Sequence, residues 1–159
     1  MNIKVINMHS KLYPQQLLKI INPPKKLFVL GDETILNNKS ISIVGSRCCT
    51  AYGAELARMF TKILAQNGIT IISGMAKGID SQAHLGAIEV GEKTIAVLGS
   101  GFNHIFPSKE IFNIILENKG TIITEYEPDV EVFSQGFRDR NRIVAGLSNR
   151  NFSYRSKSK

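Results

Sequence analysis

The feature that most constrains the fold of this sequence is a regular alternation of short apolar segments with longer amphipathic ones between residues 41 and 147. The apolar segments are residues 41–44, 69–72, 94–98 and 121–124. The longer segments are residues 51–66, 80–90, 108–118 and 137–147. Almost continuously apolar runs are typical of strands that a parallel sheet buries on both faces, and the longer segments are interpreted as helices. The alternation predicts an α/β fold in which a doubly wound, mostly parallel sheet forms the middle of three α/β/α layers.

Residues 1–40 precede this alternation, and we expect them to form a lead-in segment that packs on the core. Residues 15–21 are interpreted as a short helix, which Pro23 and Pro24 bring to an end. The apolar run at residues 27–30 is interpreted as an edge strand. The core proper is predicted to cover residues 41–149, so the chain of 159 residues forms one domain.

Composition restricts the class of protein further. Cys48 and Cys49 are the two cysteines of the chain, and neighbouring cysteines form neither a useful bridge nor a zinc set, which indicates a reducing compartment. No apolar stretch approaches the roughly 20 residues of a membrane helix, and the start has no apolar core of signal-peptide type, so we expect a cytoplasmic protein without a membrane partner. The net charge of +7 suits a polyanion, but four of the positive residues lie in the last ten positions. Positioned charges must therefore carry any nucleic-acid hypothesis.

Each of the first three predicted strands in the core is followed by a turn that contains glycine. The turns are Gly45-Ser46-Arg47, Ser73-Gly74-Met75-Ala76-Lys77-Gly78 and Gly99-Ser100-Gly101. Because parallel strands end at one edge of the sheet, we expect these turns to line a single crevice. Backbone N–H groups exposed by glycine, helix N-termini and the side chains of Arg47 and Lys77 would suit phosphate there. The alternative is that the glycines only meet the needs of tight turns.

The same turns argue against a nicotinamide cofactor. The first turn does not have the form G-x-G-x-x-G, and the second strand ends in Ser73-Gly74 rather than in an acidic residue. No metal-ligand set and no pair of nucleophile and base is visible either. We therefore expect neither a cofactor nor a metal.

A cluster of arginines opens the last predicted helix, in the string Phe137-Arg138-Asp139-Arg140-Asn141-Arg142. Arg138 and Arg142 are four residues apart and share a helix face. Arginine binds phosphate in bidentate fashion and stacks on bases, and Phe137 would offer a platform for an unpaired base. The alternative is a solvated helix face with Phe137 in the core.

An ordered set of short strings resembles the core of the DNA-processing protein A (DprA/Smf) family. The strings are Gly45-Ser46-Arg47, Ser73-Gly74-x-Ala76-x-Gly78-Ile79-Asp80-x-x-Ala83-His84, Ala96-Val97-Leu98-Gly99-x-Gly101, Phe106-Pro107, Thr124-Glu125-Tyr126 and Phe137-Arg138-x-Arg140-Asn141-Arg142-Ile143-Val144-Ala145-Gly146-Leu147-Ser148. Tyr13-Pro14, and Pro23-Pro24 ahead of Gly31-Asp32, resemble the entry to that core. Each string alone is weak, but the ordered set is specific to the family and runs from about Tyr13 to Ser148.

The resemblance implies a Rossmann-like core that binds single-stranded DNA without sequence preference and delivers it to the RecA recombinase in natural transformation or recombination. It also implies a homodimer and no catalytic residues. The DNA-contact candidates carried over by position are Ser46, Arg47, Gly74, Lys77, Gly78, Gly99, Gly101, Phe137, Arg138, Arg140, Asn141 and Arg142. Arg47 and the aromatic and arginine residues of the last helix are the foremost of these.

The sequence departs from the family after Ser148. The family continues into a buried strand and further α/β units, whereas here a basic stretch at 150–159 follows, so we expect a core truncated after the fourth core helix and no strand there. One possible back-translation of residues 150–157, read in another frame, encodes Ala-Ile-Leu-Val-Ile-Glu-Ala. We therefore hypothesise that residues 150–159 are an aberrant tail produced by a frameshift. Since family dimerisation uses later parts of the core, the truncation puts the homodimer in question.

Two other functions stay open at this point. Asp80 and Glu125 near the rim would serve an enzyme as an acid/base pair, but a helix cap and a strand-end carboxylate explain them too. The related nucleotide phosphoribohydrolases carry Pro-Gly-Gly-x-Gly-Thr, which is absent here. His84 is either a crevice residue or a structural histidine, and Cys48 is expected to be inert. The third possibility is a non-functional remnant of a frameshifted gene.

Overall fold

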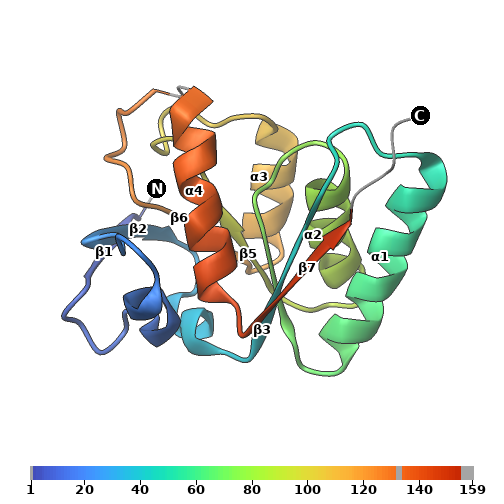
Figure 1. Cartoon of the computed structure of the whole chain (residues 1–159), viewed down its shortest axis with the longest axis horizontal. Coiled ribbons are helices and arrows are strands. Elements are labelled where there is room, and N and C mark those ends of the chain that lie inside the picture. The colour runs from blue at the N-terminus through green and yellow to red at the C-terminus, as the bar shows by residue number, and fades with distance from the viewer. Residues whose placement is uncertain (1, 132–133, 155–159) are drawn as a thin grey trace.

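The computed structural model describes residues 2–131 and 134–154, the last five of them by their backbone alone. Within this part of the chain, seven strands form one sheet in the order β1-β2-β6-β5-β4-β3-β7 (Figure 1). The strands are β1 (Lys4–Asn7), β2 (Lys26–Leu30), β3 (Ser40–Gly45), β4 (Thr70–Ser73), β5 (Thr94–Val97), β6 (Thr121–Thr124) and β7 (Arg150–Tyr154). Strands β3 to β7 are parallel to one another, whereas β2 pairs antiparallel with both β1 and β6. The predicted mostly parallel α/β sheet is confirmed.

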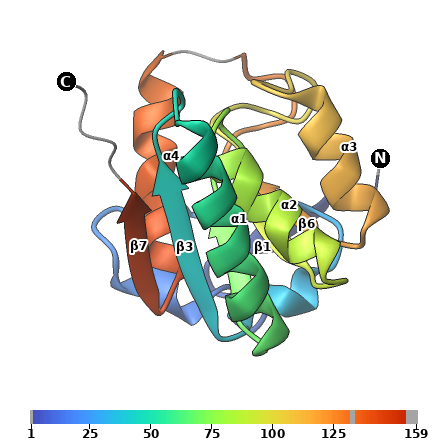
Figure 2. The ribbon, with the colours of Figure 1, turned by 90° about the vertical axis from the view of Figure 1, so that its right-hand side faces the viewer.

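Helices cover both faces of this sheet. The α-helices are α1 (Ala51–Gln66), α2 (Ile79–Glu89), α3 (Lys109–Glu117) and α4 (Ser134–Leu147), and two short 3-10 helices are η1 (Gln15–Lys19) and η2 (Glu33–Asn37). Figure 2 shows α4 on one side of β3 and β7, with α1 and α2 on the other. On its side, α4 packs on β3, β4 and β5 and also touches η1. The three predicted layers are therefore present.

The central strands are buried at every position, which explains why their sequences lack polar alternation. All four residues of β4, of β5 and of β6 are buried. Burying one Ile side chain contributes roughly 1.5–3 kcal/mol, so the isoleucines of these strands stabilise the sheet strongly. The few hydroxyls among them are satisfied: Ser73 Oγ donates to the Ile43 carbonyl at 2.6 Å, and Thr94 Oγ1 to the Ile71 carbonyl at 2.8 Å. The sheet thus buries polar side chains without leaving them unpaired.

The first 40 residues contribute strands to the sheet in addition to packing on it. The expected edge strand at 27–30 is instead β2, which lies between β1 and β6. Leu27, Val29 and their neighbours in this run are buried, as an interior strand requires. An apolar run of four residues does not by itself distinguish an interior strand from an edge strand, which is why the edge assignment was wrong. The expected short helix appears as η1.

The expectation that no strand follows the last core helix was also wrong. Residues 150–154 form β7, which pairs in parallel with β3 from Ile41↔Arg150 to Gly45↔Tyr154. The open edge of β3 presents unpaired N–H and C=O groups, and a backbone can satisfy them whatever its side chains are. The frameshift hypothesis concerns the coding DNA and stays a prediction, and residues 155–159 of that tail lie outside the described residues.

One further property of the helices follows from their length and composition. None of those in the described part of the chain is both long enough and apolar enough to cross a lipid bilayer.

Candidate functional site

The predicted meeting of the strand ends is present, because β3, β4 and β5 are parallel neighbours in the sheet. Arg47 follows β3 and Lys77 follows β4, and both side chains are exposed at this rim. Ser46, which precedes Arg47, is half-buried, and its carbonyl packs against Gly78. The rim therefore carries two exposed cations from adjacent turns, as the sequence predicted.

The glycines of these turns are packed against protein rather than open to a ligand. A Cβ on Gly99 would lie 3.0 Å from the Gly136 carbonyl oxygen, and one on Gly74 or Gly101 would overlap neighbouring atoms outright. All three positions are buried. Gly78 has a φ of +80°, which glycine tolerates best. The expected phosphate cradle of Gly74, Gly99 and Gly101 is therefore not formed, because α4 and the chain before it occupy that space.

Arg140 is the side chain that fills the crevice between β4 and β5. It is only 4% exposed, and its Nη1 donates to the carbonyl of Gly74 and, at 2.6 Å, to the carbonyl of Val97. Burial lowers the pKa of its guanidinium, and the Asp80 carboxylate opposes that shift. The prediction that Arg140 contacts DNA does not fit this buried position. Its hydrogen bonds to the carbonyls of Gly74 and Val97 instead hold the ends of β4 and β5 together beneath the rim.

Asp80 faces Arg140 from the first turn of α2. Its Oδ1 accepts from the Gly45 N–H at 3.3 Å and its Oδ2 from the Gly74 N–H at 3.1 Å, so one carboxylate joins the ends of β3 and β4. Burial raises the pKa of Asp80, while Arg140 and these N–H groups act to lower it. The N-cap of α2 is Gly78, so the prediction that Asp80 caps this helix was wrong.

Arg142 is also engaged within the protein. Its Nη1 and Nη2 bind Glu125 Oε1 and Oε2 at 2.6 and 2.7 Å, and its Nε donates to the Asn22 carbonyl at 3.1 Å. This bidentate pair ties α4 to the turn after β6 and to the lead-in segment. Glu125 thus pairs with Arg142, whereas Asp80 accepts from the N–H groups of Gly45 and Gly74 and is stabilised by the charge of Arg140. The acid/base role considered from the sequence stays a prediction. Arg138 and Asn141 remain exposed on α4.

Three side chains from three different elements form an aromatic and cationic platform at the rim. The Phe137 ring, at the start of α4, lies 5.5 Å from the Phe106 ring, between centroids, with an interplanar angle of 55°. The guanidinium carbon of Arg47 lies 5.7 Å from the Phe137 centroid, within cation–π range. Phe106, in the loop after β5, is 49% exposed. We call these three residues the rim platform.

The sequence predicted two members of the rim platform, Arg47 and Phe137, and missed the third. Phe106 entered the sequence argument only as part of the Phe106-Pro107 string. Its position beside Phe137 joins residues 31 places apart, and no local pattern reveals such a pairing. The structural signal is that Phe106, Phe137 and Arg47 lie together in one aromatic and cationic surface, since contiguous patches of this kind mark binding sites.

His84 lies in the core, away from the exposed side chains of the rim. His84 is fully buried, and its Nδ1 lies 2.8 Å from Thr94 Oγ1, which itself donates to the Ile71 carbonyl. The histidine must therefore donate through Nδ1, and burial lowers its pKa to about 3, so it is neutral and structural. Cys48 is exposed and Cys49 packs beside the core. Among the described residues, no group of three or more His, Cys, Asp or Glu side chains is placed to hold a metal.

Comparisons with known proteins agree on one family. The family model of DNA recombination-mediator protein A matches residues 4–159. Protein Smf of Escherichia coli K12 is 40% identical over 149 residues, which are 92% of this chain and 40% of that protein. The X-ray structure of DNA processing protein A (DprA) from Streptococcus pneumoniae superposes with a TM-score of 0.88 at 32% identity, over 96% of this chain and 54% of that one. The chain thus spans about half the length of these relatives.

A second solved structure covers this chain completely. DNA processing protein A from Helicobacter pylori superposes with a TM-score of 0.86 at 28% identity, over 100% of this chain and 72% of that one. That structure describes the single-stranded DNA binding mode of the H. pylori protein.

Proposed function

The chain belongs to the DNA recombination-mediator protein A (DprA/Smf) family, and we propose on that premise that its rim binds single-stranded DNA without sequence preference. The observation that carries the proposal is the rim platform. Phe106 and Phe137 offer ring faces, and Arg47 adds a positive charge on the same surface. Stacking on aromatic rings requires bases that are not enclosed in a duplex, and every base has a face to stack, so such a platform selects strand state rather than sequence.

Cations around the rim platform supply the electrostatic part of the proposal. Lys77 and Arg138 are exposed, and Arg47 is exposed beside Phe137. Positively charged side chains in a row along a nucleic-acid strand neutralise phosphates and release counterions, which makes binding depend on salt. We assign the phosphates to these three residues and the bases to Phe137 and Phe106.

Buried groups beneath the rim support a positioning role. Arg140 and Asp80 join the turns after β3, β4 and β5 through four hydrogen bonds to backbone groups. A rigid support of this kind holds binding side chains in place and reduces the entropy lost on binding. In the proposal, Arg140 contributes to DNA binding by fixing the rim and does not touch the DNA.

The partner functions of the family extend the proposal. Delivery of the bound strand to the RecA recombinase, formation of a homodimer and a place in the cytoplasm are supported here by family membership alone. A RecA-loading assay on a strand coated by single-stranded-DNA-binding protein tests the first of these. Acceleration of RecA filament growth by this chain is the expected outcome, and no acceleration would contradict this part of the proposal.

We also propose that the protein is a binding protein rather than an enzyme. Asp80 accepts two backbone N–H groups, Glu125 is held through both oxygens by Arg142, and His84 is buried and neutral. A general acid or base needs a free position next to a substrate, and these groups are occupied by partners in the fold. This arrangement supports a non-catalytic role over the phosphoribohydrolase alternative.

The test of the central proposal is a titration of the purified protein against labelled oligothymidylate and a matched duplex at two salt concentrations. We expect preference for the single strand and weaker binding at the higher salt. A cooperative thermal melt of the same sample shows that the chain is folded. A folded sample that binds neither nucleic acid, or that prefers the duplex, would contradict the proposal.

A further inference from the structure

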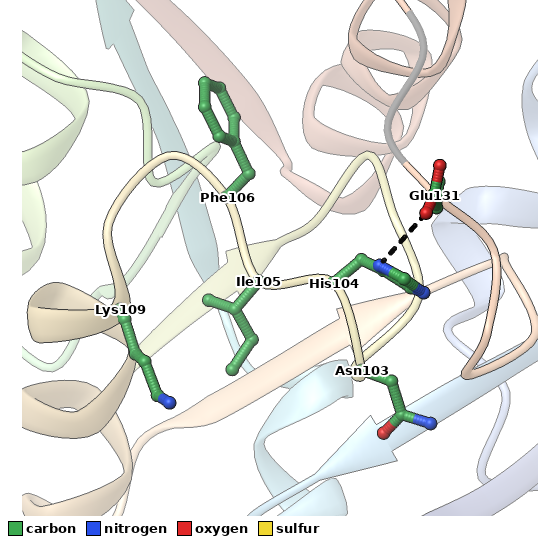
Figure 3. A pocket seen from close by; sticks show the side chains of 6 residues that line it. All are labelled: Asn103, His104, Ile105, Phe106, Lys109 and Glu131. Atoms are coloured by element: carbon green, nitrogen blue, oxygen red, sulfur yellow. Dashed lines mark ion pairs between the residues drawn. The ribbon is translucent and has the colours of Figure 1, made fainter.

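An open cavity of about 450 Å³ adjoins the rim platform and is not used by the function proposed above. Six residues of the loop after β5, the start of α3 and the segment before α4 line it: Asn103, His104, Ile105, Phe106, Lys109 and Glu131 (Figure 3). Phe106 belongs both to this cavity and to the rim platform. The two features therefore meet at one aromatic ring.

The walls of the cavity combine three kinds of chemistry. Ile105 and Phe106 are apolar. Figure 3 shows the Phe106 ring on the side of the loop opposite to Ile105, whereas the exposed cation Lys109 extends on the Ile105 side. Asn103 Nδ2 donates to Asp129 Oδ1 at 2.6 Å, which fixes the amide so that its Oδ1 is an oriented acceptor. His104 turns toward Glu131, with 4.0 Å between Nδ1 and Oε1 (Figure 3). Apolar faces, an oriented acceptor and a nearby cation match the flat face, the edge N–H and the phosphate of a nucleotide.

The position of the cavity, next to the rim platform, indicates which nucleotide along a bound strand would reach it. A base stacked on Phe137 lies next to Phe106, and the strand must continue past that ring in one direction or the other. On the cavity side it meets Ile105 and Lys109, and the cavity volume falls in the range of small-molecule sites. We propose that this cavity is a second nucleotide subsite, in which the base of a neighbouring nucleotide packs on Ile105 while Lys109 meets its phosphate. This inference rests on the proposed single-stranded DNA binding.

Base binding at the subsite can be distinguished from binding at the rim platform with a ligand that lacks bases. Two oligomers of equal length are compared, one of thymidylate and one with abasic sites throughout, so that the phosphates are the same. In the double variant Phe106→Ala/Phe137→Ala, stacking on the rim platform is absent, and we expect thymidylate still to bind several-fold more tightly than the abasic strand. Adding Asn103→Ala to that variant removes the oriented acceptor and should lower the ratio further, because one hydrogen bond to the base is lost.

Lys109→Ala tests the phosphate contact at the subsite. We expect it to lower the slope of log affinity against log salt by about 0.7, the value for one phosphate of a single strand. Lys39→Ala is the matched control, because Lys39 is exposed just before β3, at the end of the sheet opposite the rim. It removes the same charge and should leave the slope unchanged.

The possible results keep the two proposals apart. If the folded wild type binds no single strand, the proposed function itself fails. If the wild type binds, but the double variant Phe106→Ala/Phe137→Ala shows no difference between thymidylate and abasic strands, the cavity holds no base and this inference is overturned. An unchanged salt slope in Lys109→Ala, with every variant folded by circular dichroism, would overturn the phosphate contact.

Discussion

The guanidinium of Arg140 occupies the space above Gly74 that any larger residue would need. Its Nη1 donates to the Gly74 carbonyl, and a Cβ placed on Gly74 would overlap the guanidinium nitrogens and carbon. Gly74 at the end of β4 and Arg140 in α4 therefore depend on each other, although they lie 66 positions apart in the sequence. The Ser73-Gly74 turn is explained by this packing rather than by a ligand that approaches the backbone.

Gly74→Ala is expected to destabilise the protein by about 2–4 kcal/mol, because the added methyl group forces a buried arginine away from its carbonyl partners. Urea unfolding followed by circular dichroism measures the change. Gly91→Ala is the matched control: φ is +76° there and no atom lies within 4 Å of the added Cβ, so only a conformational cost of about 1 kcal/mol applies. Equal losses in the two variants would show that Arg140 yields without cost.

Arg140→Met is expected to lower the free energy of unfolding by about 3 kcal/mol near neutral pH, since it leaves the buried Asp80 carboxylate without its cation. Burial already raises the pKa of Asp80, and loss of Arg140 raises it further. A carboxyl whose folded pKa exceeds its unfolded value of about 3.9 favours the folded state below that value, and this contribution is lost as pH rises through the folded pKa.

Stability measured across this pH range checks the sign. We expect the gap between wild type and Arg140→Met to narrow as pH falls toward about 4, because Asp80 is then protonated and needs no partner. A stability difference that stays constant from neutral pH to pH 4 would show that Arg140→Met does not destabilise the protein through the charge of Asp80. Arg138→Met, at an exposed position of the same helix, serves as the control and should change little.

The arginines of α4 also show which features of the fold the sequence could not predict. The strand and helix alternation placed β3 to β6 and α1 to α4 within a few residues, because buried parallel strands and amphipathic helices have distinct local patterns. Local patterns also located the rim and the cations Arg47 and Lys77. The spacing of arginines in α4 could not tell which guanidinium points inward, because that depends on carbonyl oxygens from β4 and β5, far away in the chain.

The two errors in the predicted sheet, the edge position given to β2 and the absence of β7, have a similar cause. Whether β2 lies inside the sheet depends on β1 and β6, and whether residues 150–154 form a strand depends on the free edge of β3. In both cases the strand position depends on pairing with a segment that is distant in the sequence. The mostly polar sequence of β7 has no apolar pattern from which a strand could be predicted. Phe106 belongs to the same class, since its role follows from contact with Phe137.

Arg47→Ala is expected to weaken binding to all single-stranded sequences alike and to reduce the salt slope by about 0.7, since it removes one phosphate partner at an exposed position. Fluorescence anisotropy with oligothymidylate and a mixed-sequence strand at several salt concentrations measures both effects. Arg47→Lys keeps the charge but not the planar group over Phe137, so it should restore the slope and only part of the affinity. A loss confined to one sequence would argue against the proposed mode.

Phe137→Ala and Phe106→Ala are each expected to weaken single-stranded DNA binding by about tenfold or more, given roughly 1–3 kcal/mol for a stacked base. The salt slope should not change, because neither ring neutralises a phosphate. Phe137→Tyr retains the ring face and is expected to bind nearly as well as wild type. If the alanine variants bind normally while their melts match wild type, the rings are packing residues and the rim platform has no role in binding.

Glu125→Gln distinguishes a binding protein from an enzyme at the end of β6. The change weakens the bidentate contact with Arg142, which is partly exposed, so we expect a loss of only about 1 kcal/mol in the free energy of unfolding. Single-stranded DNA affinity should stay within about twofold of wild type, because the pair ties α4 to the lead-in segment rather than to the rim platform. Assays of mononucleotide hydrolysis should give no turnover for either protein. Turnover by the wild type that disappears in Glu125→Gln would instead identify Glu125 as a catalytic residue and favour the phosphoribohydrolase alternative.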